Sequence, residues 1–195
     1  MDPHHADISI GLYVHETPHG PRATVHSYSR AAGTSARLAQ VAETICKMAG
    51  LRQGQSATEI EFTCGSWHSA AARRLFLEAC KQRPGETPAA PVLESPDTRT
   101  GQTIVVSPLG DGAYHVDARD VGDDETSRAP AITRAIAKLA ELELDDGLVV
   151  RFPCRRPHDE LIALLLTRAQ NLRAILREEE LQASRGVLAA PSGQE

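Results

Sequence analysis

Aromatic side chains are scarce in this chain, at 4% of its 195 residues. A stacking platform for single-stranded nucleic acid needs several exposed rings, so the composition argues against that class of protein. The core must be built mainly from Leu, Ile, Val and Ala. Basic residues are outnumbered, because 21 Lys and Arg stand against 26 Asp and Glu, for a net charge of -5. Without a general positive field, binding to nucleic acid is not expected.

Long hydrophobic runs are missing as well. No apolar stretch approaches the roughly 20 residues that a membrane-spanning helix needs. The opening Met-Asp-Pro-His-His lacks the basic and apolar regions of a signal peptide, which predicts a cytoplasmic protein without a membrane anchor. In that reducing compartment the four cysteines are expected to be thiols or metal ligands and not disulfides.

Familiar catalytic motifs are absent too. The chain has no glycine-rich phosphate loop, no Gly-x-Ser-x-Gly elbow and no His-Glu-x-x-His helix. The sequence therefore indicates neither a substrate nor a reaction.

A repeated motif is present instead. Phe62-Thr-Cys-Gly-Ser-Trp-His68 recurs ninety positions later as Phe152-Pro-Cys-Arg-Arg-Pro-His158. The same offset pairs Leu75 with Leu165 and Ala79 with Ala169, and it pairs Pro18-His-Gly20 with Pro108-Leu-Gly110. The middle helices of the two halves align best at an offset of 94, with Leu38 opposite Ile132. This self-similarity predicts an internal duplication.

Alternating apolar residues predict strands, and apolar residues at a 3.6-residue period predict helices. On these patterns each half has the element order strand–strand–helix–strand–helix. The expected strands are 7–15, 22–29, 58–63, 103–106, 113–118 and 145–152, and the expected helices 38–48, 66–79, 132–142 and 157–184. We expect an α+β fold, a two-layer sandwich in which helices cover one face of the sheet and two halves are related by a pseudo-two-fold axis. The halves are 7–82 and 102–185, within one compact domain.

The remaining segments are expected to be irregular. Residues 83–101 hold four prolines and two glycines, which predicts a surface linker without an element of its own, and residues 186–195 a flexible tail. The final helix carries more leucines than one packing face needs, so we expect the surplus to pack against the other half of the chain or to form a homo-oligomer contact.

The tandem element order resembles duplicated folds such as imidazoleglycerol-phosphate dehydratase, whose metal-binding histidines also lie where a strand meets a helix. The His-His-x-x-x-Glu signature of that enzyme is absent here. The resemblance therefore implies a fold and carries over neither ligands nor activity.

The two Cys-x3-His pairs are the candidate site. Each cysteine ends a strand and each histidine falls at the start of a helix, where the helix dipole keeps an imidazole neutral and favours a thiolate. If the halves pack about a pseudo-two-fold axis, Cys64, His68, Cys154 and His158 converge. Two thiolates and two imidazoles are a tetrahedral zinc set.

Two other interpretations stay open at this point. Arg155 and Arg156 beside Cys154 are the residues expected to bind a phosphate or another anion at the helix start. Alternatively, the cysteines are small core residues and the histidines cap their helices. The function is thus a metal-binding protein, an anion-binding protein or an oligomeric scaffold without catalysis.

Overall fold

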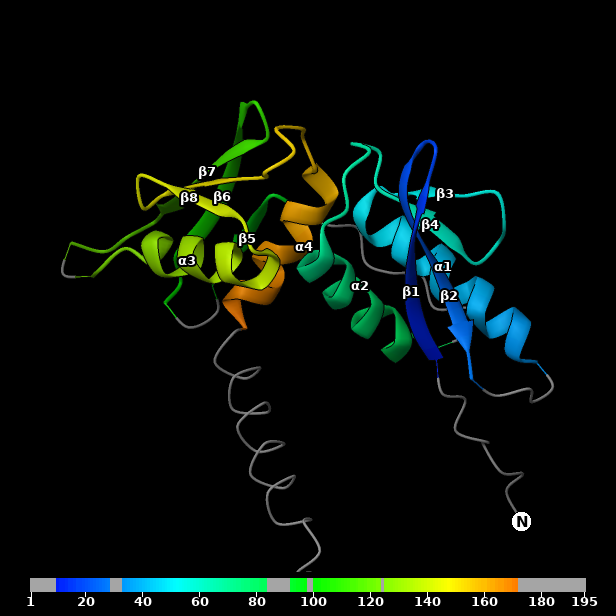
Figure 1. Ribbon diagram of the computed structural model, residues 1–195. Helices are drawn as coiled ribbons and strands as arrows, with labels where there is room; N and C mark the ends of the chain where they lie inside the picture. Colours follow the sequence, from blue (N-terminus) through cyan, green and yellow to red (C-terminus); the bar gives the residue numbers. More distant parts are fainter. Residues whose placement is uncertain (1–9, 29–32, 84–91, 98–99, 124, 172–195) are drawn as a thin grey trace, which may run out of the picture.

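The computed structural model describes residues 10–28, 33–83, 92–97, 100–123 and 125–171 (Figure 1). The described part of the first half consists of β1 (Ile10–Thr17), β2 (Gly20–Ser27), α1 (Thr34–Ala49), β3 (Arg52–Gln53), β4 (Glu59–Glu61) and α2 (Ser69–Lys81). The second half consists of β5 (Glu94–Pro96), β6 (Thr103–Gly110), β7 (Ala113–Arg119), α3 (Ala129–Ala140), β8 (Glu143–Asp145), β9 (Val149–Arg151) and α4 (Asp159–Gln170).

Each half has its own antiparallel sheet, and the fold is α+β as expected. The strand order is β1-β2-β4-β3 in the first sheet and β5-β6-β7-β9-β8 in the second. The helices α2 and α4 lie in the middle of the molecule, α3 lies below the strands of the second sheet, and α1 passes behind β1 and β2 (Figure 1). Contacts of α1 with α4 and of α2 with α3 cross from one half to the other, as a pseudo-two-fold arrangement requires.

One hydrophobic core runs through both halves. The helices supply it from stripes at three- and four-residue spacing, and the buried side chains of α1 and α3 occupy matching positions. Val41, Ile45 and Met48 correspond in this way to Ile132, Ile136 and Leu139. The two halves therefore bury their apolar faces together.

The middle helices match at a different offset from the one that the sequence suggested. Both end in a left-handed residue, Gly50 and Glu141, followed by the same backbone hydrogen bond. The Leu51 N–H donates to the Cys46 carbonyl, and the Leu142 N–H donates to the Ala137 carbonyl. Positions 46 and 137 lie 91 apart, so the offset of 94 is wrong.

The pairing of Pro18 with Pro108 is also wrong. Pro18 lies in the turn between β1 and β2, whereas Pro108 lies within β6, opposite Tyr114. The expected turn at 108–112 is reduced to Asp111 and Gly112, because β6 continues to Gly110.

Three short strands were not predicted. β3 and β8 extend the two sheets, and β5 lies in the proline-rich stretch that was expected to have no regular element. The final helix begins at Asp159, so Pro157 precedes its N-cap and does not occupy its first turn. The predicted extension of that helix to 184 and the tail at 186–195 lie outside the described residues.

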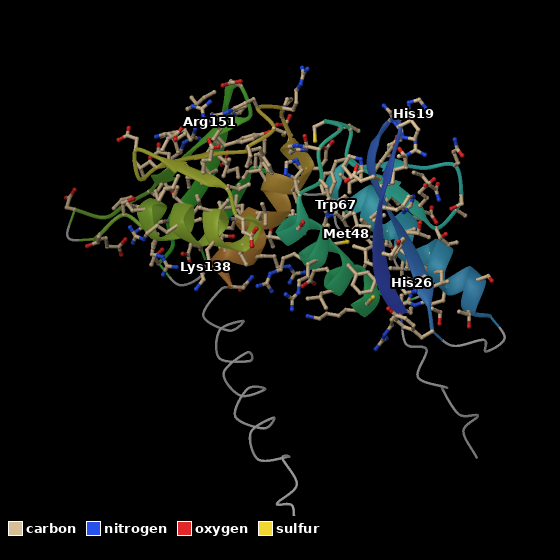
Figure 2. All side chains as sticks on the ribbon, viewed as in Figure 1. His19, His26, Met48, Trp67, Lys138 and Arg151 are labelled. Carbon is tan, nitrogen blue, oxygen red and sulfur yellow. The ribbon has the colours of Figure 1, made fainter. Side chains whose placement is uncertain are left out.

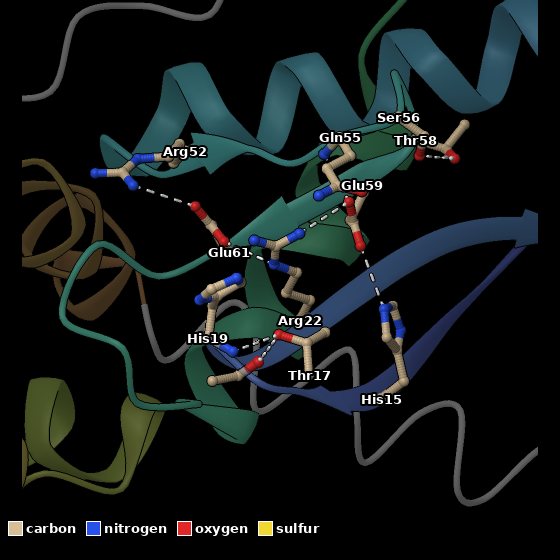
Figure 3. Close-up of polar contacts among 11 residues, drawn as sticks. His15, Thr17, His19, Arg22, Arg52, Gln55, Ser56, Thr58, Glu59 and Glu61 are labelled. Carbon is tan, nitrogen blue, oxygen red and sulfur yellow. Dashed lines mark hydrogen bonds and ion pairs between the residues drawn. The ribbon is translucent and has the colours of Figure 1, made fainter.

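The face of the first sheet that points away from the helices carries a polar network (Figure 3). Ile60 is buried in the core, and its neighbours Glu59 and Glu61 face the other way. Arg22 Nε lies 2.8 Å from Glu61 Oε2, and Glu59 lies between Arg22 and His15 at 3.5 and 3.3 Å. These ion pairs connect the side chains of β4 with those of the β1–β2 hairpin.

Candidate metal centre

The two Phe-x-Cys-x3-His segments fold into the same loop. After β4 the Phe62 carbonyl accepts the Gly65 N–H at 3.0 Å, and after β9 the Phe152 carbonyl accepts the Arg155 N–H at 3.0 Å. Gly65 and Arg155 have positive φ angles of 74° and 57°. This tight turn points the intervening cysteine back toward the helix that follows.

Each histidine is the N-cap residue of that helix. The His68 carbonyl accepts the Ala72 N–H at 2.8 Å, and the His158 carbonyl accepts the Ile162 N–H at 2.9 Å. Neither side chain forms a capping hydrogen bond. The rings are therefore free to turn to the cysteine of their own loop, which they approach with Nε2.

The four side chains converge on one point. Cys64 Sγ lies 3.3 Å from His68 Nε2, and Cys154 Sγ lies 3.2 Å from His158 Nε2. Across the halves the two imidazole rings are 4.9 Å apart, centroid to centroid, at 82°. One ligand atom from each of the four residues lies within 4.8 Å of every other. The convergence expected from the repeat is confirmed.

Two phenylalanine rings support the histidines reciprocally. Phe62 contacts His68 of its own half at 4.9 Å and His158 of the other half at 6.1 Å between ring centroids. Phe152 contacts His158 at 4.6 Å and His68 at 5.6 Å. This exchange of like contacts is what a two-fold interface produces. It limits the orientations open to both imidazoles.

Burial sets the protonation of the site. It lowers the pKa of His68, and together with the nearby His68 ring it lowers the pKa of His158 to about 4, although Asp159 acts in the opposite direction. Both imidazoles are therefore neutral at pH 7, as metal ligands must be. Burial and the neighbouring Cys154 thiol raise the pKa of Cys64, partly offset by the Ser66 backbone.

Neighbouring groups form hydrogen bonds with the cysteine and histidine residues of the cluster. The Ser66 N–H donates to Cys64 Sγ at 3.4 Å. In the second half the Tyr114 hydroxyl accepts the His158 backbone N–H at 2.6 Å and donates to Asp159 Oδ1 at 2.7 Å. Tyr114 is buried and comes from β7, and sequence reasoning missed it, because no local pattern connects it with a residue 44 positions away.

The donor set could hold a metal ion. Ligand atoms at 2.0–2.3 Å from a tetrahedral zinc ion lie roughly 3.3–3.8 Å from one another. The sulfur–nitrogen separations within the two pairs, 3.3 and 3.2 Å, are close to that range, and the four ligand atoms together lie within a wider limit of 4.8 Å. Two cysteines and two histidines also form a ligand set of the soft and borderline kind that selects zinc over calcium or magnesium.

The two arginines predicted to bind an anion lie in the same loop as Cys154. Arg155 Nη2 forms an ion pair with Glu143 Oε2 at 2.8 Å, so one of the two cations expected at the anion site is already matched by a carboxylate. Arg156 is exposed. The anion site stays a prediction. Cys46 and Cys80 lie in α1 and α2 and contribute no ligand to this cluster.

Within the described ranges, no helix is long and apolar enough to cross a membrane. Comparison of the chain with protein-family models, with curated proteins and with solved structures finds no match. The resemblance to the dehydratase fold gains no support from these comparisons. The candidate metal centre therefore rests on the geometry of this chain's own residues.

Proposed function

We propose that this protein binds one zinc ion per chain through Cys64, His68, Cys154 and His158, and that the ion stabilises the packing of the two halves against each other. The observation that supports the proposal is the approach of four ligand atoms from two distant segments to within 4.8 Å of one another. Each half supplies one cysteine and one histidine, so neither half alone offers a complete ligand set.

A structural role is favoured over a catalytic one. Four protein ligands fill the coordination of tetrahedral zinc, and a catalytic zinc keeps one position for water or substrate. The site also lies at the junction of the halves, where Phe62 and Phe152 contact histidines of both. The bound ion would contribute to folding free energy directly.

Metal analysis of the purified full chain tests the proposal. We expect about one zinc per chain and, after replacement by Co²⁺, the intense visible absorption of a tetrahedral site with thiolate ligands. The double variant Cys64→Ser with Cys154→Ser should lose the metal and unfold at a lower temperature. Strong chelators should lower the melting temperature of the wild type to a similar degree.

The other two cysteines provide the matched control. Cys46 and Cys80 are also partly buried free thiols, and their double change to Ser removes the same number of sulfur atoms. That variant should keep its metal. A wild-type chain that takes up no zinc on titration, or a Cys64/Cys154 variant that retains it, would contradict the proposal.

A further inference from the structure

The two halves differ at the outer edge of their sheets. In the second half β5 pairs antiparallel with β6, and the Val106 N–H donates to the Leu93 carbonyl at 2.8 Å. In the first half β1 occupies the position of β6, and no described strand pairs with its outer edge. Among the described residues, the first half thus has no counterpart of β5.

The backbone of β1 is oriented to accept such a strand. The Val25 N–H donates to the Thr58 carbonyl on the β4 side of β2. Val25 is paired with Leu12, so this pair is not hydrogen-bonded within the β1–β2 hairpin. The N–H and carbonyl of Leu12 therefore point away from β2. Val106, which is paired with Val116 in the same way, uses its N–H to bind the Leu93 carbonyl, directly before β5.

Apolar side chains beside this edge are only partly covered. Leu12 and Phe76 are half-buried, whereas their counterparts beside β5, Val106 and Leu166, are 2% and 0% exposed. Between β1 and α2 lies a groove of about 380 Å³, and Trp67 lines it (Figure 2). We call it the β1–α2 groove; it is lined by Leu12, Val14, Trp67, Phe76, Leu77 and Arg73. Its lining is suited to apolar side chains of an added strand.

The rim of the groove is basic. Arg73 lines both the β1–α2 groove and an adjoining hollow of about 370 Å³ between α2 and α3. Lys138 and Arg74 also line the hollow, with Glu141 as its one acidic residue. Arg73 and Lys138 form no hydrogen bond or ion pair with another described residue. An acidic ligand would supply partners for both cations.

We propose that the β1 edge is a docking site for an extended acidic segment of a partner protein. The segment adds antiparallel to β1, binds the backbone of Leu12, inserts apolar side chains into the β1–α2 groove and places a carboxylate near Arg73. The chain's own β5 segment shows the chemistry of such an occupant. It reads Val92-Leu-Glu-Ser-Pro-Asp97, apolar followed by acidic, and it fills the equivalent edge of the second half.

A synthetic peptide with the sequence of residues 91–98 is the probe. Its position on β6 is already taken by the chain itself, which leaves the β1 edge. Trp67 is the only tryptophan and lies in the groove, so its fluorescence reports binding to the full-length protein. We expect saturable binding and slower hydrogen exchange of the Leu12 amide. No change at Trp67 up to millimolar peptide, or saturation without protection of Leu12, overturns the proposal.

Charge reversal tests the acidic partner. Arg73→Glu should weaken binding about two- to fivefold, and a peptide carrying Lys in place of Glu94 should restore it on this variant. Arg134→Glu, an exposed reversal on α3 outside the groove, is the control and should leave binding unchanged. If the Leu12 amide becomes protected with rising protein concentration alone, the occupant is a second copy of the chain, and the proposed partner is wrong.

Discussion

Glu78 on α2 forms an ion pair with Arg168 on α4, and the two residues stand ninety positions apart at equivalent places of the two halves. In a duplicated fold, equivalent positions meet only where a pseudo-two-fold axis passes between them. The contact between Glu78 and Arg168 is consistent with such an axis, as is the cysteine–histidine cluster, which includes the N-cap residues of the same two helices.

Reversal of one member of this pair should destabilise the fold. Glu78 is largely buried, and Glu78→Arg would bring a second guanidinium group next to that of Arg168. Because like charges repel, we expect a loss of about 2–3 kcal/mol in the free energy of unfolding. The exchange of both residues, Glu78→Arg with Arg168→Glu, should recover part of it. Recovery is partial because Lys81 lies 3.7 Å from Glu78 and would repel the new arginine. Urea denaturation of the wild type, the two single variants and the double variant measures the coupling free energy between the two residues. Strictly additive losses of stability would show that the ion pair contributes nothing.

Removal of the Tyr114 hydroxyl should affect both stability and the metal site. Tyr114→Phe leaves the His158 N–H and Asp159 without their buried partner, which should cost about 1–3 kcal/mol. Because that hydrogen bond fixes the start of α4, zinc affinity should fall by about tenfold or more. Competition with a chromophoric chelator measures it. Tyr28→Phe, at an exposed hydroxyl, serves as the comparison and should change neither quantity.

Glu59 should determine part of the acid sensitivity of the fold. Burial raises the pKa of Glu59, but the Gln55 N–H, His15 and Arg22 together lower it by more, so that the pKa lies below its ordinary value of 4.5. The unfolded chain thus binds this proton more readily, and the stability from Glu59 is complete above pH 4.5 and lost as pH falls through the folded pKa. Glu59→Gln should lower stability at pH 7 and flatten the fall below pH 4.5. Equal acid slopes in denaturation curves of the two proteins would contradict this account.

A glycine at the end of α3 should stabilise the protein. Glu141 has a φ of 53°, which costs an L-residue about 1 kcal/mol, and its counterpart after α1 is Gly50. We expect Glu141→Gly to raise the free energy of unfolding by roughly 0.5–1 kcal/mol. The converse change, Gly50→Ala, should be destabilising, because Gly50 has a φ of 59°, which strains any residue with a Cβ. Thermal melts of both variants provide the check, and a lower melting temperature for Glu141→Gly would refute it.

The sequence was sufficient to predict that the four cysteine and histidine side chains converge, because the motif is local and repeated. Each cysteine and its histidine are four positions apart, so one turn brings them together, and the repeat supplies the symmetry that joins the pairs. The α+β class followed from the same alternation and helical stripes. Periodicity alone left the middle helices ambiguous, since a shift of three residues keeps a helical stripe nearly in register.

Contacts between distant segments could not be predicted from the sequence. β5 has only three residues and contains Pro96, so no periodic pattern marks it, and pairing with β6 alone makes it a strand. The role of Tyr114 depends on where β7 lies beside α4. The two helices were predicted to begin too early, at 66 and 157, because their actual N-caps, His68 and His158, use no side-chain hydrogen bond.

The reciprocal contacts of Phe62 and Phe152 have a consequence for sequence change in this protein. In a dimer of identical subunits every substitution would occur twice, once on each side of the cysteine–histidine cluster. Here both loops belong to one chain, so the same position of the turn can be glycine in one loop, Gly65, and in the other Arg155, whose charged side chain forms an ion pair with Glu143. The linkage also turns assembly of the four ligands into an intramolecular event, independent of protein concentration. The two loops are thereby free to acquire different neighbours around a shared centre.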